Sequence, residues 1–157
     1  LLRYPKQAEI ICRSLKEKII GSLKNIDIIL SPALGGIVVG YEVGKQLEKE
    51  TIFAERVEKK LMLRRGFVIP ANTNVLIVED VITTGKSALE CSNLVKINQA
   101  KLAGYACIID RTNSNSLIQE KIISQIKFKI ETYKENELPE KLRKIPPTNP
   151  GSRNISK

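Results

Sequence analysis

The 157-residue sequence contains no histidine and no tryptophan, and aromatic residues make up only 4% of it. Without histidine the chain cannot form a Ser-His-Asp triad or a Cys-His pair, and it has no histidine general base or metal ligand. The few aromatic residues disfavour a surface on which the bases of single-stranded nucleic acid would stack. Any catalysis must therefore depend on carboxylates, lysine, arginine, hydroxyl groups, backbone amides or a metal ion held by oxygen.

Cysteine is also scarce, because Cys12, Cys91 and Cys107 are the only three and form no CxxC motif. Their odd number prevents complete pairing within the chain, so we expect neither a disulfide framework nor a structural zinc site, and a cytoplasmic protein fits best. The longest apolar stretch, Ala33–Val43, is interrupted by Glu42 and is too short to cross a bilayer. We therefore expect no membrane partner.

Basic residues outnumber acidic ones by 26 to 17, which gives a formal charge of +9. Such an excess favours an anionic partner, which could be a nucleic acid, a membrane surface or a phosphorylated small molecule. The lysines are spread along the chain, so a generally solvated surface explains much of the excess equally well. The length and the 42% hydrophobic content predict a single domain over residues 1–157.

Hydrophobic periodicity predicts an alternation of helices and strands. The predicted helices are 5–20, 37–47 and 86–98, and the predicted strands are 26–30, 52–54, 75–78, 104–109 and 126–132. Segment 55–67 reads as a mobile basic loop or hairpin, and 145–157 as a C-terminal tail. This order predicts an α/β fold with a mainly parallel sheet flanked by helices, and ligands in such sheets bind beyond the carboxyl ends of the strands. Gly36, Gly40 and Gly44 recur every fourth residue and predict close packing of their helix on a neighbour.

The most informative segment is residues 74–88, in which a buried strand leads to the adjacent acids Glu79 and Asp80. Two neighbouring carboxylates at a strand end need partners, and ribose hydroxyls or hydrated Mg²⁺ are suitable ones. The following Thr83–Ser87 opens a helix, where free backbone N–H groups, hydroxyls and a glycine form an anion site. The Gly-Lys-Ser end of this loop is not a Walker A motif, because Asp80 stands where that motif needs glycine. No GxGxxG dinucleotide motif is present either.

Val75–Ala88 resembles the phosphoribosyl-pyrophosphate (PRPP) signature of the type I phosphoribosyltransferases, in which a hydrophobic strand and two acids precede a Thr- and Gly-containing phosphate loop. Among these enzymes the sequence is most similar to the orotate phosphoribosyltransferases. The similarity covers nearly the whole chain, and it is carried by the Val-Ile-Thr of 80–85 and by segments 53–56, 63–67, 103–105, 109–111 and 149–153. It implies the Rossmann-like fold of type I phosphoribosyltransferases, in a chain that lacks the N-terminal segment of the family.

The resemblance also implies an activity. The family transfers the 5-phosphoribosyl group of PRPP to N1 of orotate, giving orotidine 5'-monophosphate and pyrophosphate in the UMP branch of pyrimidine biosynthesis. Mg²⁺ is the implied cofactor, held mainly through PRPP and water with no direct protein ligand. The implied partners are PRPP, orotate and a second copy of the chain in a homodimer with shared active sites, and not nucleic acid.

The site residues implied by the resemblance fall into four groups. The catalytic group is Glu79, Asp80, Arg56 and Lys60. The PRPP-binding group is Glu79, Asp80, Val81, Ile82, Thr83, Thr84, Gly85, Lys86 and Ser87. The orotate-binding group is Thr83 and Arg111, where an arginine fork suits a carboxylate. The pyrophosphate loop is Leu34, Gly35 and Gly36, with Gly35 where better-known orotate enzymes carry lysine.

Three other interpretations remain open at this point. A phosphoribosyltransferase for a purine or uracil would share the PRPP loop, although Arg111 suits a carboxylated base. A non-catalytic nucleotide- or RNA-binding regulator of the same fold would also account for the charge of +9, and its RNA binding would depend steeply on salt. A kinase of the PRPP-synthesising type would need an ATP site that the sequence does not reveal.

Overall fold

In a computed structural model of the chain, helices and parallel strands alternate along most of the sequence, and residues 1–114, 116–129, 131, 133 and 135–146 are described. The helices are α1 (Pro5–Ile20), α2 (Gly35–Leu47), α3 (Lys86–Ile97), the 3₁₀ turn η1 (Glu135–Glu137) and α4 (Glu140–Arg143). The strands are β1 (Ile28–Pro32), β2 (Glu50–Val57), β3 (Lys60–Leu63), β4 (Asn74–Ile82), β5 (Lys101–Asp110) and β6 (Ile122–Lys127).

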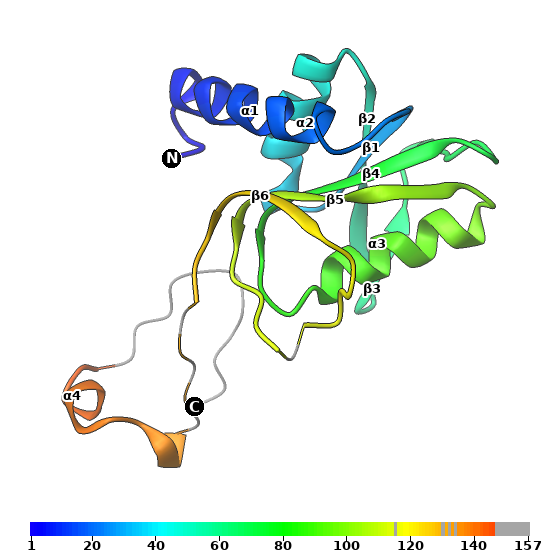
Figure 1. The fold of residues 1–157 in the computed structure, drawn as a ribbon. Coiled ribbons are helices and arrows are strands. Elements are labelled where there is room, and N and C mark those ends of the chain that lie inside the picture. Colours follow the sequence, from blue (N-terminus) through cyan, green and yellow to red (C-terminus); the bar gives the residue numbers. More distant parts are fainter. Residues whose placement is uncertain (115, 130, 132, 134, 147–157) are drawn as a thin grey trace.

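The strands form one six-stranded sheet in the order β3-β2-β1-β4-β5-β6. Every neighbouring pair is parallel except β2 and β3, which form an antiparallel hairpin. Helices α1 and α2 lie on one face of the sheet and α3 on the other (Figure 1). The predicted α/β fold with a mainly parallel sheet is therefore confirmed.

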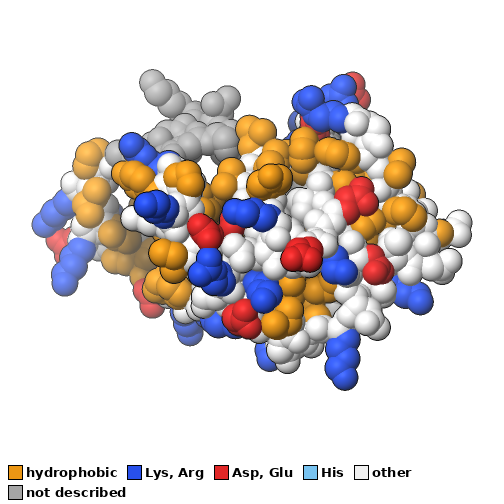
Figure 2. All heavy atoms as spheres, turned by 90° about the horizontal axis from the view of Figure 1, so that it is seen from above, with side chains coloured by type: hydrophobic (Ala, Val, Ile, Leu, Met, Phe, Trp, Pro, Cys, Tyr) orange, Lys and Arg blue, Asp and Glu red, His pale blue; other side chains and the backbone are white. Residues whose placement is uncertain are grey.

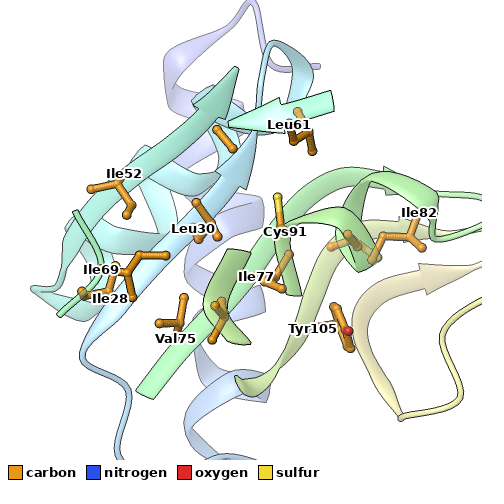
Figure 3. Packing of buried hydrophobic residues seen from close by; sticks show 14 of the residues in the cluster. Ile28, Leu30, Ile52, Leu61, Ile69, Val75, Ile77, Ile82, Cys91 and Tyr105 are labelled. Atoms are coloured by element: carbon orange, nitrogen blue, oxygen red, sulfur yellow. The ribbon is translucent and has the colours of Figure 1, made fainter. Parts of the chain in front are cut away.

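The central strands are apolar at successive positions because helices cover both faces of the sheet. On β1, Ile28 and Leu30 belong to the core beneath α3, whereas Ile29 belongs to the core beneath α1 and α2. Figure 3 shows the first of these cores, in which Leu61 of β3 and Cys91 of α3 lie among residues from the central strands. The β2–β3 hairpin is thus anchored to the domain core through Leu61.

Helix α2 packs very closely on the sheet, as its glycine spacing predicted. A Cβ atom added at Gly40 would lie 2.0 Å from Ser31 Oγ, and one added at Gly44 would lie 1.8 Å from Thr51 Oγ1. Neither position has room for a larger residue without movement of the helix. The Gly40 contact holds the middle of α2 against Ser31 near the carboxyl end of β1, which is the edge of the sheet where the candidate site lies.

Strand β6 lies earlier in the chain than the predicted strand 126–132, and that prediction was wrong in both position and buried face. Its register is set by parallel pairing with β5, in which Tyr105 is opposite Ile122, and by Ile123, which packs in the core shared with α1. Ile126 and Phe128, whose alternation with lysines predicted the strand, are 45% and 48% exposed. Positions 130 and 132 lie outside the described residues.

Within the part of the chain that the structure describes, none of the helices has the length and apolar character needed to span a membrane. All three cysteines are buried free thiols. On the face seen in Figure 2, basic side chains are interspersed with acidic and apolar ones instead of forming a single block. The predicted tail 145–157 lies outside the described residues except for positions 145 and 146.

Candidate functional site

Three segments that are distant in sequence meet at the carboxyl edge of the sheet. The β1–α2 turn, the β2–β3 hairpin and the start of α3 enclose a cleft of about 780 Å³. It is lined by Ala33, Leu34, Gly35, Glu55, Arg56, Lys59, Lys86 and Ser87. Residues predicted to contact pyrophosphate and phosphate therefore face one common space, as the topology of a parallel sheet requires.

Glu79 and Asp80 lie near the end of β4, which continues to Ile82 and so extends beyond the predicted strand 75–78. Their side chains leave opposite faces of the strand. Asp80 lies on the α2 side, where a Cβ atom added at Gly35 would be 2.6 Å from its Oδ2. Its Oδ1 accepts a hydrogen bond from the Val81 N–H at 2.9 Å. Gly35 thus lets the β1–α2 turn approach the carboxylate directly.

Glu79 projects toward the α3 side, where burial is the main cause that raises the pKa of the Cys91 and Cys107 thiols and the negative charge of Glu79 adds to it. Burial, with a further contribution from the charge of Asp80, raises the pKa of Glu79 from 4.5 to about 7. The described residues contain no group of three or more His, Cys, Asp or Glu side chains arranged to hold a metal ion. Carboxylate oxygens such as those of Glu79 and Asp80 can accept from hydroxyl groups and from the water shell of a cation.

The raised pKa makes a prediction for stability. Between pH 4.5 and about 7 the unfolded chain ionises at Glu79 before the folded chain does, so the free energy of unfolding falls as pH rises through this window. At 1.36 kcal/mol per pKa unit the cost reaches roughly 3 kcal/mol above pH 7. Glu79→Gln should therefore unfold at a higher temperature than the wild type at pH 8 and at nearly the same temperature at pH 4.5, by calorimetry in metal-free buffer. Glu50→Gln, on an exposed side chain of β2, is the control, and a Glu79→Gln advantage that does not vary with pH would contradict the prediction.

The predicted phosphate-binding residues Thr83–Gly85 form a short loop, and α3 begins immediately after it. Gly85 has a φ of +78°, and its would-be Cβ would lie 2.7 Å from Ile118 Cγ1, so only glycine fits here. Thr84 is held in place because its carbonyl accepts the Leu117 N–H at 2.9 Å. Thr83 and Thr84 are exposed beside the N-terminus of α3, and Thr84 Oγ1 accepts from the Lys86 N–H at 3.4 Å.

The remaining predicted PRPP-binding residues differ in exposure. Ile82 is fully buried in the core with Ile118, so its side chain is not available to a ligand. Its carbonyl accepts the Arg111 N–H at 2.8 Å. Val81 is half-buried, Lys86 is exposed and Ser87 is half-buried. Ile82 therefore serves to connect β4 with the segment that carries Arg111.

Arg111 lies beside the end of β4, and its side-chain Nε is buried with no hydrogen-bond partner among the described residues. The neighbouring Asp110 does not accept a hydrogen bond from Arg111 Nε. It forms an ion pair with Lys127 at 3.0 Å and accepts hydrogen bonds from Thr112 N and Oγ1. Burial acts to raise the pKa of Asp110, but the bonds from Thr112 and Lys127 outweigh it and hold that pKa below 3.8. A buried guanidinium donor without a partner is costly unless a ligand satisfies it.

The basic segment 55–67 forms a hairpin, which was one of its two predicted structures. The turn residues Glu58 and Lys59 both have positive φ, as a two-residue type I′ loop requires. Arg56 Nη1 donates to Lys59 O at 2.6 Å and to Glu90 Oε2 at 2.9 Å. Lys59 lines the cleft whereas Lys60, the predicted catalytic lysine, is not among the lining residues. Arg64 and Arg65 form ion pairs with Glu55 at the base of the hairpin.

Two residues at the site were not found from the sequence. Ile118 packs against Gly85, and Glu90 binds Arg56. The sequence signal for Ile118 was absent, because it lies in an irregular segment. Glu90 was read as an ordinary position of the α3 helix, and its partner is 34 residues away.

We next compare the chain with known protein families, with similar sequences and with solved structures. The phosphoribosyl transferase domain family matches residues 4–138. The chain is 44% identical over 154 residues to an orotate phosphoribosyltransferase of Methylorubrum extorquens (strain PA1), covering 98% of this chain and 79% of that protein. It is 42% identical over 153 residues to one from Chlorobaculum parvum, covering 98% and 78%.

Among solved structures, an adenine phosphoribosyltransferase from Trypanosoma brucei has a similar fold. The TM-score is 0.64 at 18% sequence identity, and the match covers 98% of this chain and 75% of that one. At this identity the likeness concerns the fold alone. The family match and the identity to the curated relatives show that the chain belongs to the orotate phosphoribosyltransferase family.

Proposed function

We propose that the chain transfers the 5-phosphoribosyl group of PRPP to orotate, giving orotidine 5'-monophosphate and pyrophosphate. One observation carries this proposal: the β1–α2 turn, the basic hairpin and the start of α3 line a single cleft, and Asp80 of β4 lies next to Gly35 in its lining. The relatives at 37% to 44% identity are named orotate phosphoribosyltransferases, which supports orotate as the base.

The phosphoribosyl part of the substrate is assigned to β4 and α3. The 5'-phosphate binds the N–H groups and hydroxyls of Thr83–Ser87, and the ribose hydroxyls bind Glu79 and Asp80. In the reaction the C1–O bond to pyrophosphate breaks and a C1–N1 bond to orotate forms. Positive charge develops on the ribose between these events, and the Asp80 carboxylate stabilises it by electrostatic attraction.

The base is assigned to Thr83 and Arg111. Orotate carries a carboxylate, and the unpartnered Arg111 Nε offers a donor that such an anion satisfies. Its ring nitrogen acts as an anion, so the reaction needs no strong general base. The absence of histidine from the sequence is therefore compatible with this chemistry.

The leaving group is assigned to the β1–α2 turn and the hairpin. The backbone at Leu34, Gly35 and Gly36 approaches the diphosphate, and Arg56 with Lys59 supplies positive charge from across the cleft. Mg²⁺ is the proposed cofactor, and it supplies charge neutralisation of the diphosphate when it binds with PRPP. Glu79 and Asp80 suit its water shell, because carboxylate oxygens are the acceptors that hydrated Mg²⁺ prefers.

We also propose a homodimer that acts in the cytoplasm. Three apolar side chains on and before α2 support association, because Leu34, Val38 and Tyr41 are 83%, 47% and 65% exposed. The free, buried thiols are compatible with a reducing compartment. Sedimentation of the purified chain measures the association, and a monomer at micromolar concentration would contradict it.

The activity is tested by adding orotate, PRPP and Mg²⁺ to the purified chain and following the loss of orotate absorbance. Parallel reactions replace orotate with adenine or with uracil, or omit Mg²⁺. We expect Mg²⁺-dependent loss of orotate alone. Consumption of adenine or uracil instead would change the assigned base. No turnover in any reaction, together with steeply salt-dependent RNA binding, would favour a non-catalytic nucleotide- or RNA-binding regulator.

A further inference from the structure

The carboxylate of Glu90 joins the basic hairpin to the helix that carries the phosphate loop. Glu90 lies one turn into α3, and its Oε2 accepts from Arg56 Nη1 at 2.9 Å and from the Leu61 N–H at 3.3 Å. Arg56 and Leu61 are opposite each other in the β2–β3 pairing. One carboxylate oxygen therefore holds both strands of the hairpin at the same level.

This contact determines which part of the Arg56 guanidinium is available. Nη1 is occupied by Glu90 and by the Lys59 carbonyl, whereas Nε and Nη2 have no partner among the described residues. The guanidinium is a planar group with fixed donor directions, so fixing Nη1 also fixes where the other donors point. Arg56 lines the cleft together with the β1–α2 turn.

The other hairpin arginines are held differently. Arg64 and Arg65 both pair with Glu55, while Lys59 and Lys60 form no ion pair within the part of the chain that the structure describes. Arg56 is thus the cleft-lining arginine that a carboxylate from a separate element restrains. An unrestrained arginine on a hairpin would lose side-chain entropy on binding an anion, and restraint before binding reduces that cost.

From these contacts we infer that Glu90 is a positioning residue, which orients Arg56 toward the diphosphate of the substrate. The inference rests on the proposed function, because it assigns a role to a residue that does not itself touch the substrate. A purely structural role would act mainly through stability. The pair is partly exposed, at 40% for Arg56 and 23% for Glu90, and such ion pairs contribute little to folding. Leu61 also packs in the core, which gives the hairpin a second point of attachment.

The first test measures binding of inorganic pyrophosphate in the presence of Mg²⁺ by calorimetry. We expect Glu90→Ala to weaken binding roughly tenfold, and Glu90→Gln, which keeps an acceptor oxygen, to weaken it less. The matched control is Glu9→Ala, which removes a partner from the 2.6 Å Arg13–Glu9 ion pair on α1. Unchanged pyrophosphate affinity in Glu90→Ala would overturn the inference.

The second test is a double-mutant cycle with Arg56→Ala. If Glu90 acts through Arg56, Glu90→Ala should have no further effect in the Arg56→Ala background, on pyrophosphate affinity or on kcat. Fully additive losses would overturn the inference, as would a loss in Glu90→Ala that is matched by a fall in unfolding temperature and not rescued by Glu90→Gln.

These measurements separate the inference from the proposed function. Pyrophosphate binding needs no orotate, so the cycle reports on Glu90 even if another base proves to be the substrate. If the wild type consumes orotate and the cycle is additive, the role of Glu90 fails while the function stands. If the cycle is non-additive and orotate is not consumed, the role of Glu90 stands while the proposed function fails.

Discussion

Replacing Asp80 by asparagine should lower kcat/KM for PRPP by about 100- to 1,000-fold, which is the range found when one electrostatic group at a reacting centre is removed. The variant keeps an oxygen that can accept from the Val81 N–H, as Asp80 Oδ1 does at 2.9 Å. The local backbone should therefore be retained while the negative charge near the ribose is lost. Initial rates of orotate loss at varied PRPP concentration measure the effect.

Asp27→Asn is the matched control, because Asp27 lies just before β1 at the opposite edge of the sheet. Its carboxylate accepts from Asn74 N at 2.7 Å and Nδ2 at 2.8 Å. This substitution makes the same chemical change away from the cleft and should leave kcat unchanged. Wild-type turnover in Asp80→Asn would refute the assignment of the β4 carboxylates, and a large fall in its unfolding temperature would make the activity loss uninformative about charge.

Gly35→Ala should lower kcat/KM by about 10- to 100-fold while leaving the protein at least as stable as the wild type. The added Cβ would lie 2.6 Å from Asp80 Oδ2 and 3.0 Å from its Cγ, so the carboxylate must move. A displacement of about 1 Å at a reacting centre can cost up to 100-fold in rate. Alanine is the better helix former by up to about 1 kcal/mol, and position 35 opens α2.

The comparison uses steady-state kinetics beside thermal unfolding. Gly21→Ala is the control, because Gly21 caps α1 at an ordinary φ of −73° and lies outside the cleft. It should leave both rate and affinity unchanged. A fully active Gly35→Ala would mean that Asp80 has room to rotate without consequence. In the Asp80→Asn background the Gly35→Ala loss should shrink, because the displaced charge is already gone.

The sequence predicted the central strands and the start of α3 well because their signals are local. The apolar run of β4, the two acids within it and the glycine before α3 can be recognised from the sequence without knowledge of the residues that pack against them. The predicted strand 75–78 ends before β4 does, because the adjacent acids Glu79 and Asp80 interrupt the apolar run. Pairing with β5, in which Glu79 is opposite Cys107 and Ile82 opposite Asp110, extends the strand through them.

The features that the sequence did not predict depend on contacts between distant residues. The position of β6 follows from burial of Ile123 beneath α1 and not from the alternation of Ile126 and Phe128 with lysines. Lys59 lines the cleft and Lys60 does not, and this difference accompanies a local two-residue turn at Glu58 and Lys59. Glu90 and Ile118 gain their roles only when α3 meets the hairpin and the segment after β5.

The burial of all three cysteines makes the native thiols unreactive toward thiol reagents. Cys12, Cys91 and Cys107 are each 0% exposed, and burial raises the pKa of Cys12 to about 11 and that of Cys107 to about 12. Thiol reagents react with exposed thiolates, so the native chain offers them no target at neutral pH. A single cysteine introduced at the exposed Lys60 would consequently be the one reactive thiol, and a fluorophore or spin label attached there would follow the hairpin during turnover without removal of any native residue from the core.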